Sequence, residues 1–159
     1  MRIANIILTS QNGGAEQVFI DYMRVLKNLG HEVLAIIKND APYASNLSKL
    51  GIETKKTENK LGYHDFFAVK NIQKFLEEFD ADVVIENMGR SMVLVKKALK
   101  KIKNKKVFFI AVNHSYNVKR SMGADLILSV NKPIFFKTID HGQGENASFV
   151  IPNATDLND

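Results

Sequence analysis

Two adjacent glycines, Gly13 and Gly14, stand between an apolar segment and a segment of helical periodicity. Glycine allows positive φ and lets a ligand approach the backbone closely, and the free N–H groups at the start of a helix attract phosphate. The surrounding loop, 9–16, lacks the glycine spacing of the dinucleotide fingerprint and of the Walker loop. The pair therefore predicts either a phosphate-binding loop of another type or a tight strand-to-helix turn, in which Glu16 would stabilise the first helical turn.

His114 is the histidine best placed to meet a ligand, because it follows the apolar run 107–112 closely. An imidazole at the end of a strand can donate a hydrogen bond or a proton near neutral pH. The alternative is a histidine that only closes a loop. That alternative is expected for His31 and His64, and His141 is expected to be solvated.

A polar turn at 86–90 follows another apolar run, 82–85. Its Asn87 and Arg90 could reach the same crevice, with Arg90 as the partner of an anion or a hydroxyl group. A plain polar turn that carries a helix-start signal explains the same residues equally well.

Short apolar runs alternate with segments of helical spacing along the chain, which predicts βαβ units. Strands are expected at 3–8, 33–37, 52–55, 82–85, 107–112, 125–130 and 148–151. Helices are expected at 18–29, 42–50, 66–79, 91–102 and after Pro133, and a loop at 56–63. The apolar strands predict an α/β fold: Rossmann-like and doubly wound, with a mainly parallel sheet of about seven strands and helices on both faces. Ligands bind at the C-terminal ends of the strands in such a sheet, which is where the three loops above lie.

The composition fits a single globular domain, with 159 residues, 45% hydrophobic and 25% charged. The chain has no cysteine, which excludes disulfides, cysteine-ligated zinc, iron–sulfur clusters and a thiol nucleophile. No apolar run approaches the roughly 18 residues of a membrane span, and the start of the chain does not resemble a signal peptide. A cytoplasmic protein is therefore expected.

The formal charge of +5 depends on seven lysines between 96 and 106, without which the chain would carry −2. Lysines near the end of a helix complement its dipole, so a solvated face is one interpretation. The other is attachment to an anionic membrane surface, worth about 1 kcal/mol per lysine. Lys97, Lys100 and Lys101 are the docking candidates. Nucleic acid is not expected as a partner, because the segment has no aromatic residue to stack on bases.

Six segments, in this order, resemble the N-terminal domain of family 4 glycosyltransferases, which are retaining enzymes of GT-B architecture. The segments are Gly13-Gly14-Ala15-Glu16, Leu29-Gly30-His31-Glu32-Val33, Ala81-Asp82-Val83-Val84, His114, Gly123-Ala124-Asp125-Leu126-Ile127-Leu128-Ser129-Val130 and Val150-Ile151-Pro152-Asn153-Ala154-Thr155-Asp156. The resemblance covers almost the whole chain.

The resemblance implies transfer of a sugar from a nucleotide-diphosphate sugar to an acceptor hydroxyl, with retention of configuration. Gly13 and Gly14 would lie by the donor diphosphate, with backbone N–H groups facing the phosphates. His114 would be the catalytic residue that faces the donor sugar. No cofactor is implied, and no bound metal, because the sequence shows no clustered carboxylates and histidines.

The N-terminal domain of this family mainly binds the acceptor. The acceptor-side candidates are therefore Asn87, Arg90, Tyr63 and His64. The resemblance leaves open whether the acceptor is a glycan or is lipid-linked, and it implies cell-envelope polysaccharide or lipopolysaccharide synthesis. The enzyme would be cytoplasmic, with peripheral association at the inner face of the membrane.

The resemblance divides the chain into an acceptor-side domain, 1–151, and the start of an interdomain linker, 152–159. Ala154-Thr155 departs from the glycine-containing pair of the family. The C-terminal nucleotide-sugar domain of the family is absent, so this chain alone is not expected to transfer sugar. The alternative function is a non-catalytic Rossmann-like binding or interaction module, since such sheets host many functions.

Overall fold

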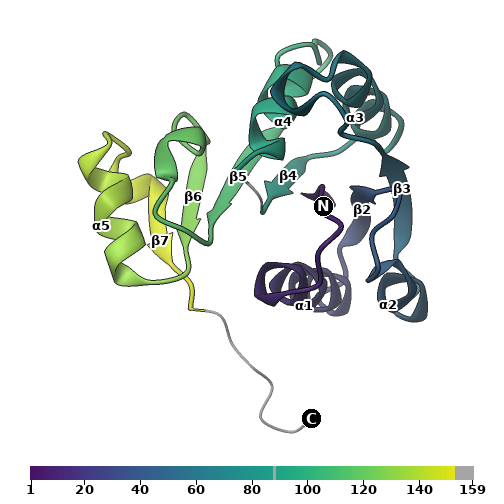
Figure 1. Cartoon of the computed structure of the whole chain (residues 1–159), viewed down its shortest axis with the longest axis horizontal. Helices are drawn as coiled ribbons and strands as arrows, with labels where there is room; N and C mark the ends of the chain where they lie inside the picture. The colour runs from purple at the N-terminus through teal and green to yellow at the C-terminus, as the bar shows by residue number, and fades with distance from the viewer. Residues whose placement is uncertain (88, 153–159) are drawn as a thin grey trace, which may run out of the picture.

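The computed structural model describes residues 1–87 and 89–152. Seven parallel strands form one sheet in the order β3-β2-β1-β4-β5-β6-β7, with helices on both faces (Figure 1). The strands are β1 Arg2–Ile7, β2 Glu32–Lys38, β3 Glu53–Thr57, β4 Val83–Glu86, β5 Phe108–Asn113, β6 Leu126–Ser129 and β7 Ser148–Val150. The α-helices are α1 Gly14–Asn28, α2 Ala44–Lys49, α3 Phe66–Glu78, α4 Ser91–Leu99 and α5 Lys132–Asp140, and the 3-10 helices are η1 Gly62–His64, η2 Val118–Arg120 and η3 Glu145–Ala147. The Rossmann-like, doubly wound prediction is confirmed.

Two details differ from the expected elements. The strand expected at 52–55 continues to Thr57, so the expected loop at 56–63 starts later and ends in η1. Asn113 is the last residue of β5 rather than the first residue of the following loop. The expected linker start at 152–159 lies outside the described residues except for Pro152.

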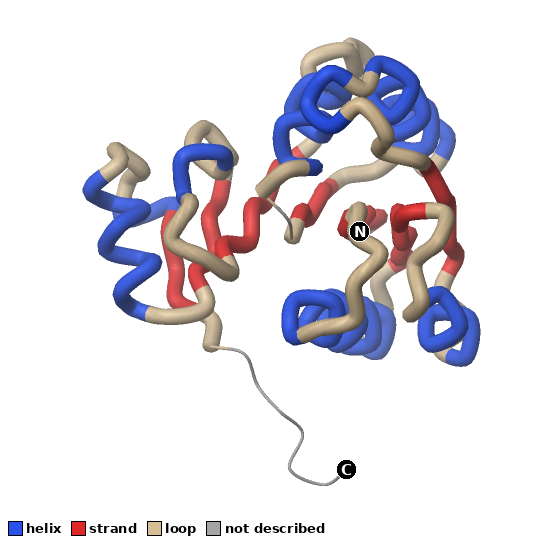
Figure 2. Tube along the Cα trace, viewed as in Figure 1, coloured by secondary structure: helices blue, strands red, loops and turns tan. Residues whose placement is uncertain are grey.

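The two faces of the sheet bury separate apolar layers, which Figure 2 shows as helices on either side of the strands. On one side, α1 and α2 pack on β1 and β2 through residues such as Phe19, Met23 and Leu47. On the other, α3 and α4 pack on alternate residues of β1, β4 and β5, including Phe109 and Ala111. At the fully parallel centre of the sheet the strands are apolar on both faces, as such burial requires.

The helix α5 lies on the α3 and α4 side. Asn113 points to that side, because Phe109, Ala111 and Asn113 are every second residue of β5 and so share one face of the sheet. Its side-chain amide donates to the hydroxyl of Thr138 on α5 over 3.3 Å. The α1 face of β5, β6 and β7 is therefore left without a helix of its own among the described residues.

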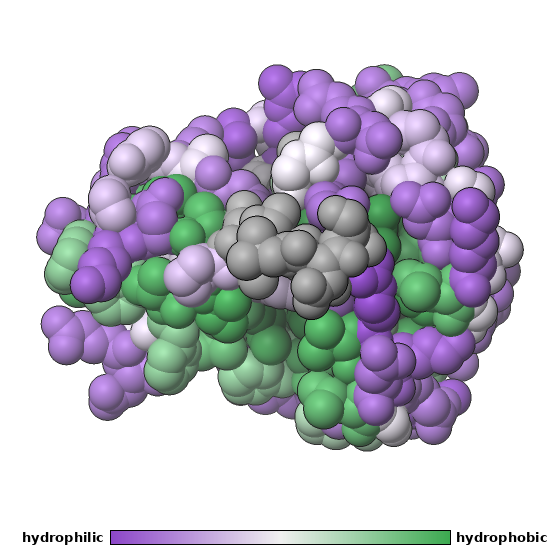
Figure 3. Space-filling model, turned by 90° about the horizontal axis from the view of Figure 1, so that it is seen from below, coloured by the Kyte–Doolittle hydropathy of each residue, from purple (hydrophilic) through white to green (hydrophobic). Residues whose placement is uncertain are grey.

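Apolar side chains remain exposed on that uncovered part of the sheet. Phe108 and Phe149 are 42% and 52% exposed, and Ile151 continues the same row beyond β7. Figure 3 views this side of the molecule and shows hydrophobic side chains gathered on it. No helix within the described part of the chain is long and apolar enough to cross a membrane.

Candidate functional site

An open cavity of about 730 Å³ lies at the carboxyl edge of the sheet. It is lined by the segments that leave four neighbouring strands, β2, β1, β4 and β5, together with parts of two connections. The lining residues are Leu8, Thr9, Ser10, Gln11, Ala15, Lys38, Asn59, Asn87, Gly89, Arg90, Val112, Asn113, His114, Ser115, Asn117 and Arg120. The cavity therefore occupies the place where parallel α/β sheets bind their ligands.

The glycine pair lies beside this cavity, since Gln11 before it and Ala15 after it both belong to the lining. Neither glycine has positive φ, so the turn does not use the conformational freedom that glycine allows. Gly13 is extended, with φ −134°, and its N–H donates to the carboxylate of Glu16 over 2.9 Å. Glu16 thus closes the first turn of α1, as the turn interpretation expected.

The two glycines differ in the space around them. A Cβ on Gly13 would lie 3.3 Å from Oε2 of Glu16, whereas a Cβ on Gly14 would meet no atom within 4 Å. The fold therefore gives no steric reason for glycine at position 14. Because the N–H of Gly13 is used by Glu16, the N–H groups available to a ligand start with Gly14 and Ala15 in the first helical turn.

His114 is half-buried in the loop that follows β5. Burial lowers the pKa of its imidazole, and the nearby negative charge of Glu16 offsets part of this shift. The ring is therefore neutral at neutral pH. Its Nε2 atom is shielded from solvent and has no hydrogen-bond partner among the described residues.

Asn87 is held rigidly after β4. It is 1% exposed, and its side-chain amide donates to Oδ1 of Asn5 over 2.6 Å and to the carbonyl of Ile6 over 3.2 Å. Its Oδ1 has no hydrogen-bond partner among the described residues, and the same holds for Oδ1 of Asn59. With Nε2 of His114, three shielded polar atoms without a described partner therefore belong to residues of one cavity. Buried polar atoms are almost always paired, so their grouping points to a ligand that supplies partners.

The remaining acceptor-side candidates, Arg90, Tyr63 and His64, lie in different places. Arg90 is exposed at the start of α4 and lines the cavity. Tyr63 does not line it, but its ring lies 5.0 Å from the guanidinium of Arg120, which does. His64 lies elsewhere, so the structure does not bring it together with Asn87 and Arg90.

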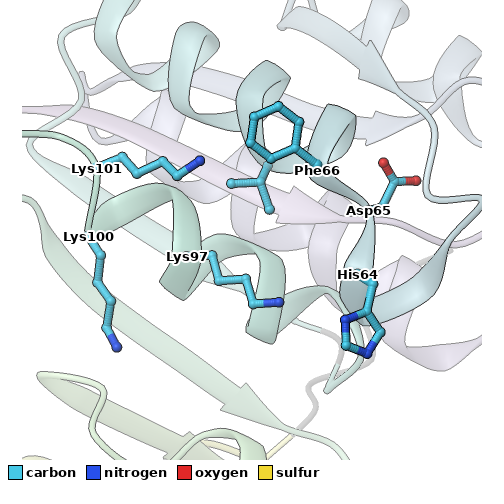
Figure 4. A pocket seen from close by; sticks show the side chains of 7 residues that line it. His64, Asp65, Phe66, Lys97, Lys100 and Lys101 are labelled. Atoms are coloured by element: carbon cyan, nitrogen blue, oxygen red, sulfur yellow. The ribbon is translucent and has the colours of Figure 1, made fainter.

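His64 lines a second cavity, of about 340 Å³, between the start of α3 and the end of α4. Figure 4 shows it with Lys97, Lys100 and Lys101, the three membrane-docking candidates. Two of these lysines have partners in the chain. Lys97 donates to the carbonyl of Tyr63 over 2.7 Å, and the Lys101 ammonium lies 4.6 Å from the Phe66 ring.

The seven lysines of 96–106 do not form one continuous patch. Lys96 donates to the carbonyls of Arg120 and Met122. Lys105 pairs with Asp80 and Asp82, and Lys106 pairs with Asp125. These three lysines are therefore held by partners in the chain. Lys97, Lys100 and Lys101, which line the second cavity, form no ion pair with a carboxylate of the described residues.

Three lining residues of the large cavity were not indicated by the sequence: Lys38, Asn117 and Arg120. Lys38 ends β2, so the rule that ligands meet the carboxyl ends of strands could have found it. Arg120 lies in η2, inside a connection without periodicity, and no pattern in the sequence indicated that its side chain reaches Tyr63. Among the described residues, no group of three or more histidines, aspartates and glutamates could hold a metal ion.

Comparison with known proteins gives no sequence relative: no family model and no curated protein matches. Solved structures do match in fold. HepE from Anabaena, in complex with UDP-glucose, superposes with a TM-score of 0.77 at 18% identity, over 99% of this chain and 45% of HepE. The lipopolysaccharide outer core galactosyltransferase WaaB gives 0.78 at 20%, over 99% of this chain and 47% of WaaB.

The same fold also occurs outside the glycosyltransferases. A putative UDP-N-acetylglucosamine 2-epimerase from Listeria monocytogenes gives a TM-score of 0.68 at 12% identity, over 93% of this chain and 43% of the epimerase. The chain therefore spans less than half the length of the solved proteins it matches. At these identities the likeness shows the fold alone: the chain has the Rossmann-like fold that makes up one half of a GT-B structure.

Proposed function

We propose that this chain is the acceptor-side half of a retaining glycosyltransferase. The enzyme would transfer a sugar from a nucleotide-diphosphate sugar to a glycan or lipid-linked acceptor in cell-envelope polysaccharide or lipopolysaccharide synthesis. The observation that carries the proposal is the shared cavity: Gln11 and Ala15, on either side of the glycine pair, line the same space as His114. The neighbours support it, since HepE is described with UDP-glucose and WaaB as a lipopolysaccharide galactosyltransferase.

In this proposal the donor diphosphate lies against the start of α1. The N–H groups of Gly14 and Ala15 have no intrahelical acceptor, and the positive end of the helix dipole favours the charge that develops on a departing diphosphate. The open space at Gly14 lets the phosphate reach the backbone. Glu16 keeps the loop in place through Gly13.

His114 contacts the donor sugar at the reaction centre. Its neutral ring and its unpartnered Nε2 suit a hydrogen bond with a sugar hydroxyl rather than an ion pair. Asn87 and Arg90 line the same cavity after β4, and we assign them to the acceptor. At the reaction centre the bond from the anomeric carbon to the diphosphate oxygen would break, a bond to the acceptor oxygen would form, and the proton of the acceptor hydroxyl would pass to the departing diphosphate.

Binding of the donor tests this function on the chain itself. Saturation-transfer NMR with UDP-glucose should detect binding with a Kd on the order of 1 mM, because the chain spans less than half the length of the GT-B structures it matches. H114A should weaken that binding several-fold, whereas H141A, at an exposed loop histidine, should not. Equal affinities of the two variants, or no binding at all, would contradict the proposal and favour a binding module without a nucleotide-sugar ligand.

We also propose that the second cavity marks the side that faces an anionic membrane. Two exposed aromatic side chains adjoin Lys101: Phe66, 60% exposed, lies under its ammonium, and Phe67, 72% exposed, contacts the Phe66 ring. Cationic side chains beside exposed aromatic ones are the combination that an anionic lipid surface attracts.

Vesicle sedimentation tests the membrane proposal. K100E/K101E should lose most of the binding to phosphatidylglycerol vesicles, while K49E/K56E, with the same change in charge on α2 and β3, should retain it. Lys97 is left in place because it supports η1. Equal binding of the two double variants would overturn the proposal.

A further inference from the structure

Two arginines on one wall of the large cavity have no acidic partner. Arg90 immediately precedes α4, Arg120 ends η2, and both line the cavity. Neither forms an ion pair with a carboxylate in the described part of the chain, and no acidic side chain belongs to the described lining. Lys38 differs, because Asp40 lies 3.2 Å from its ammonium and neutralises it.

The chain fixes the position of Arg120. Its guanidinium lies 5.0 Å from the centre of the Tyr63 ring, and Cδ and Nη1 would be 3.6 Å from a Cβ built on Gly89. The Lys96 ammonium donates to the Arg120 carbonyl over 2.6 Å and holds the backbone of η2. A stacked and packed guanidinium loses little freedom on binding, and its planar N–H groups match a phosphate or a carboxylate.

The cavity that the two arginines line also holds uncharged acceptor atoms. Oδ1 of Asn59 and Oδ1 of Asn87 are shielded from solvent, belong to lining residues, and lack a hydrogen-bond partner among the described residues. An acceptor atom requires a donor, and a ligand hydroxyl is one. These residues therefore match a ligand that carries both hydroxyl groups and a negative charge.

We propose that the acceptor of this site is a sugar or polyol that carries a phosphate or carboxylate group, bound by Arg90 and Arg120. This inference rests on the proposed function, and it names the chemical class of the acceptor. The arginines belong to the α4 side of the cavity, whereas the glycine pair leads into α1 on the opposite face of the sheet (Figure 1). We therefore assign the arginines to an anion other than the donor diphosphate.

An NMR titration of the ¹⁵N-labelled chain tests this inference with four probes: glucose 6-phosphate, glucuronate, inorganic phosphate and uncharged glucose. The readout is the set of Nε–H signals of the arginine side chains and the amide signals of Gly89 and Arg90. Glucose 6-phosphate or glucuronate should bind at least about tenfold more tightly than glucose, a ratio that corresponds to about 1.4 kcal/mol. Which of the two binds better identifies phosphate or carboxylate as the anion. Inorganic phosphate should shift the same arginine signals more weakly.

Three variants complete the test. R90Q/R120Q should weaken binding of the charged sugar at least about tenfold. R120K keeps the positive charge but loses the planar guanidinium, so it should give an intermediate loss of affinity. This variant keeps the test decisive if R90Q/R120Q fails to fold. R24Q removes an exposed arginine of α1 and should leave affinity unchanged. Unchanged affinity in R90Q/R120Q, equal binding of glucose, or shifts confined to Gly14 and Ala15 would each overturn the inference.

The outcome is separable from that of the proposed function. If UDP-glucose perturbs Gly14 and Ala15 but charged sugars leave both arginines unperturbed, this inference fails and the proposed function stands. If charged sugars bind the arginines but UDP-glucose does not bind, the anion site stands and the glycosyltransferase proposal fails.

Discussion

The carboxylate of Glu16 accepts a hydrogen bond of 2.9 Å from the backbone N–H of Gly13, although Glu16 is only 3% exposed. This contact fixes the loop between β1 and α1 from within. It also separates two glycines that look equivalent in the sequence, since Gly13 packs against Glu16 and Gly14 faces open space.

Substitution of Gly14 should separate stability from binding. G14A should leave the free energy of unfolding unchanged or raise it by up to about 0.5 kcal/mol, because the backbone there is helical and the methyl group meets no atom. The same methyl group should weaken UDP-glucose binding several-fold by blocking the approach to the helix N–H groups. Urea unfolding and NMR titration measure the two effects. G144A, in an open loop with negative φ, is the control and should not change affinity.

His114 should make stability depend on pH below neutrality. Burial lowers its pKa in the folded chain, so the unfolded chain, with a pKa near 6.5, takes up a proton first as the pH falls. The stabilisation is complete above the unfolded pKa and is lost as the pH falls from there to the folded pKa. Urea unfolding between neutral and mildly acidic pH should show this loss, and H114Q should show less of it than H141Q. Identical pH profiles in the two variants would contradict the assignment.

Asp65, which does not line the large cavity, should contribute strongly to the stability of the fold. It caps α3 by accepting from the N–H of Ala68, and it also accepts from the N–H groups of Lys60 and Leu61. Burial alone would raise the pKa of this carboxyl, but the backbone N–H groups outweigh it and lower the pKa. D65A should therefore cost about 2 kcal/mol of unfolding free energy, measured by urea unfolding at neutral pH.

The matched control for Asp65 is D140A at the exposed end of α5, which should change stability by less than about 0.5 kcal/mol. The contribution of Asp65 should vanish as the pH falls through its lowered pKa, because the folded chain then also binds the proton. A D65A variant as stable as D140A would contradict the capping role.

The uncovered apolar face of the sheet should make the free chain self-associate at high concentration. F149K should raise the concentration at which light scattering detects association, with little change in stability because Phe149 is 52% exposed. F136K, at a 60% exposed phenylalanine of α5, removes the same area elsewhere and should have a smaller effect. Equal effects of the two variants would mean that this face has no special role in association.

The sequence predicted the central strands well because burial on both faces leaves continuous apolar runs, as in β1 and β2. It underestimated β3, whose residues Lys55 and Lys56 are not apolar, because that edge strand is held by backbone pairing with β2. The rule for carboxyl ends of strands correctly indicated where Asn87, Arg90 and His114 would meet.

Features that depend on tertiary contacts could not be read from spacing. The position of Arg120 depends on Tyr63, which is distant in the sequence, so no local pattern reveals it.

The central claim is that the cavity between the glycine pair and His114 binds a nucleotide sugar. Residue-resolved NMR of the ¹⁵N-labelled chain with UDP-glucose tests it most directly. The claim predicts shifts concentrated at the amides of Gly14, Ala15 and Ser115 and at the His114 ring, and a marked reduction of these shifts in G14A. Shifts at the second cavity beside Lys100 instead, or a spectrum that UDP-glucose leaves unchanged at millimolar concentration, would contradict it.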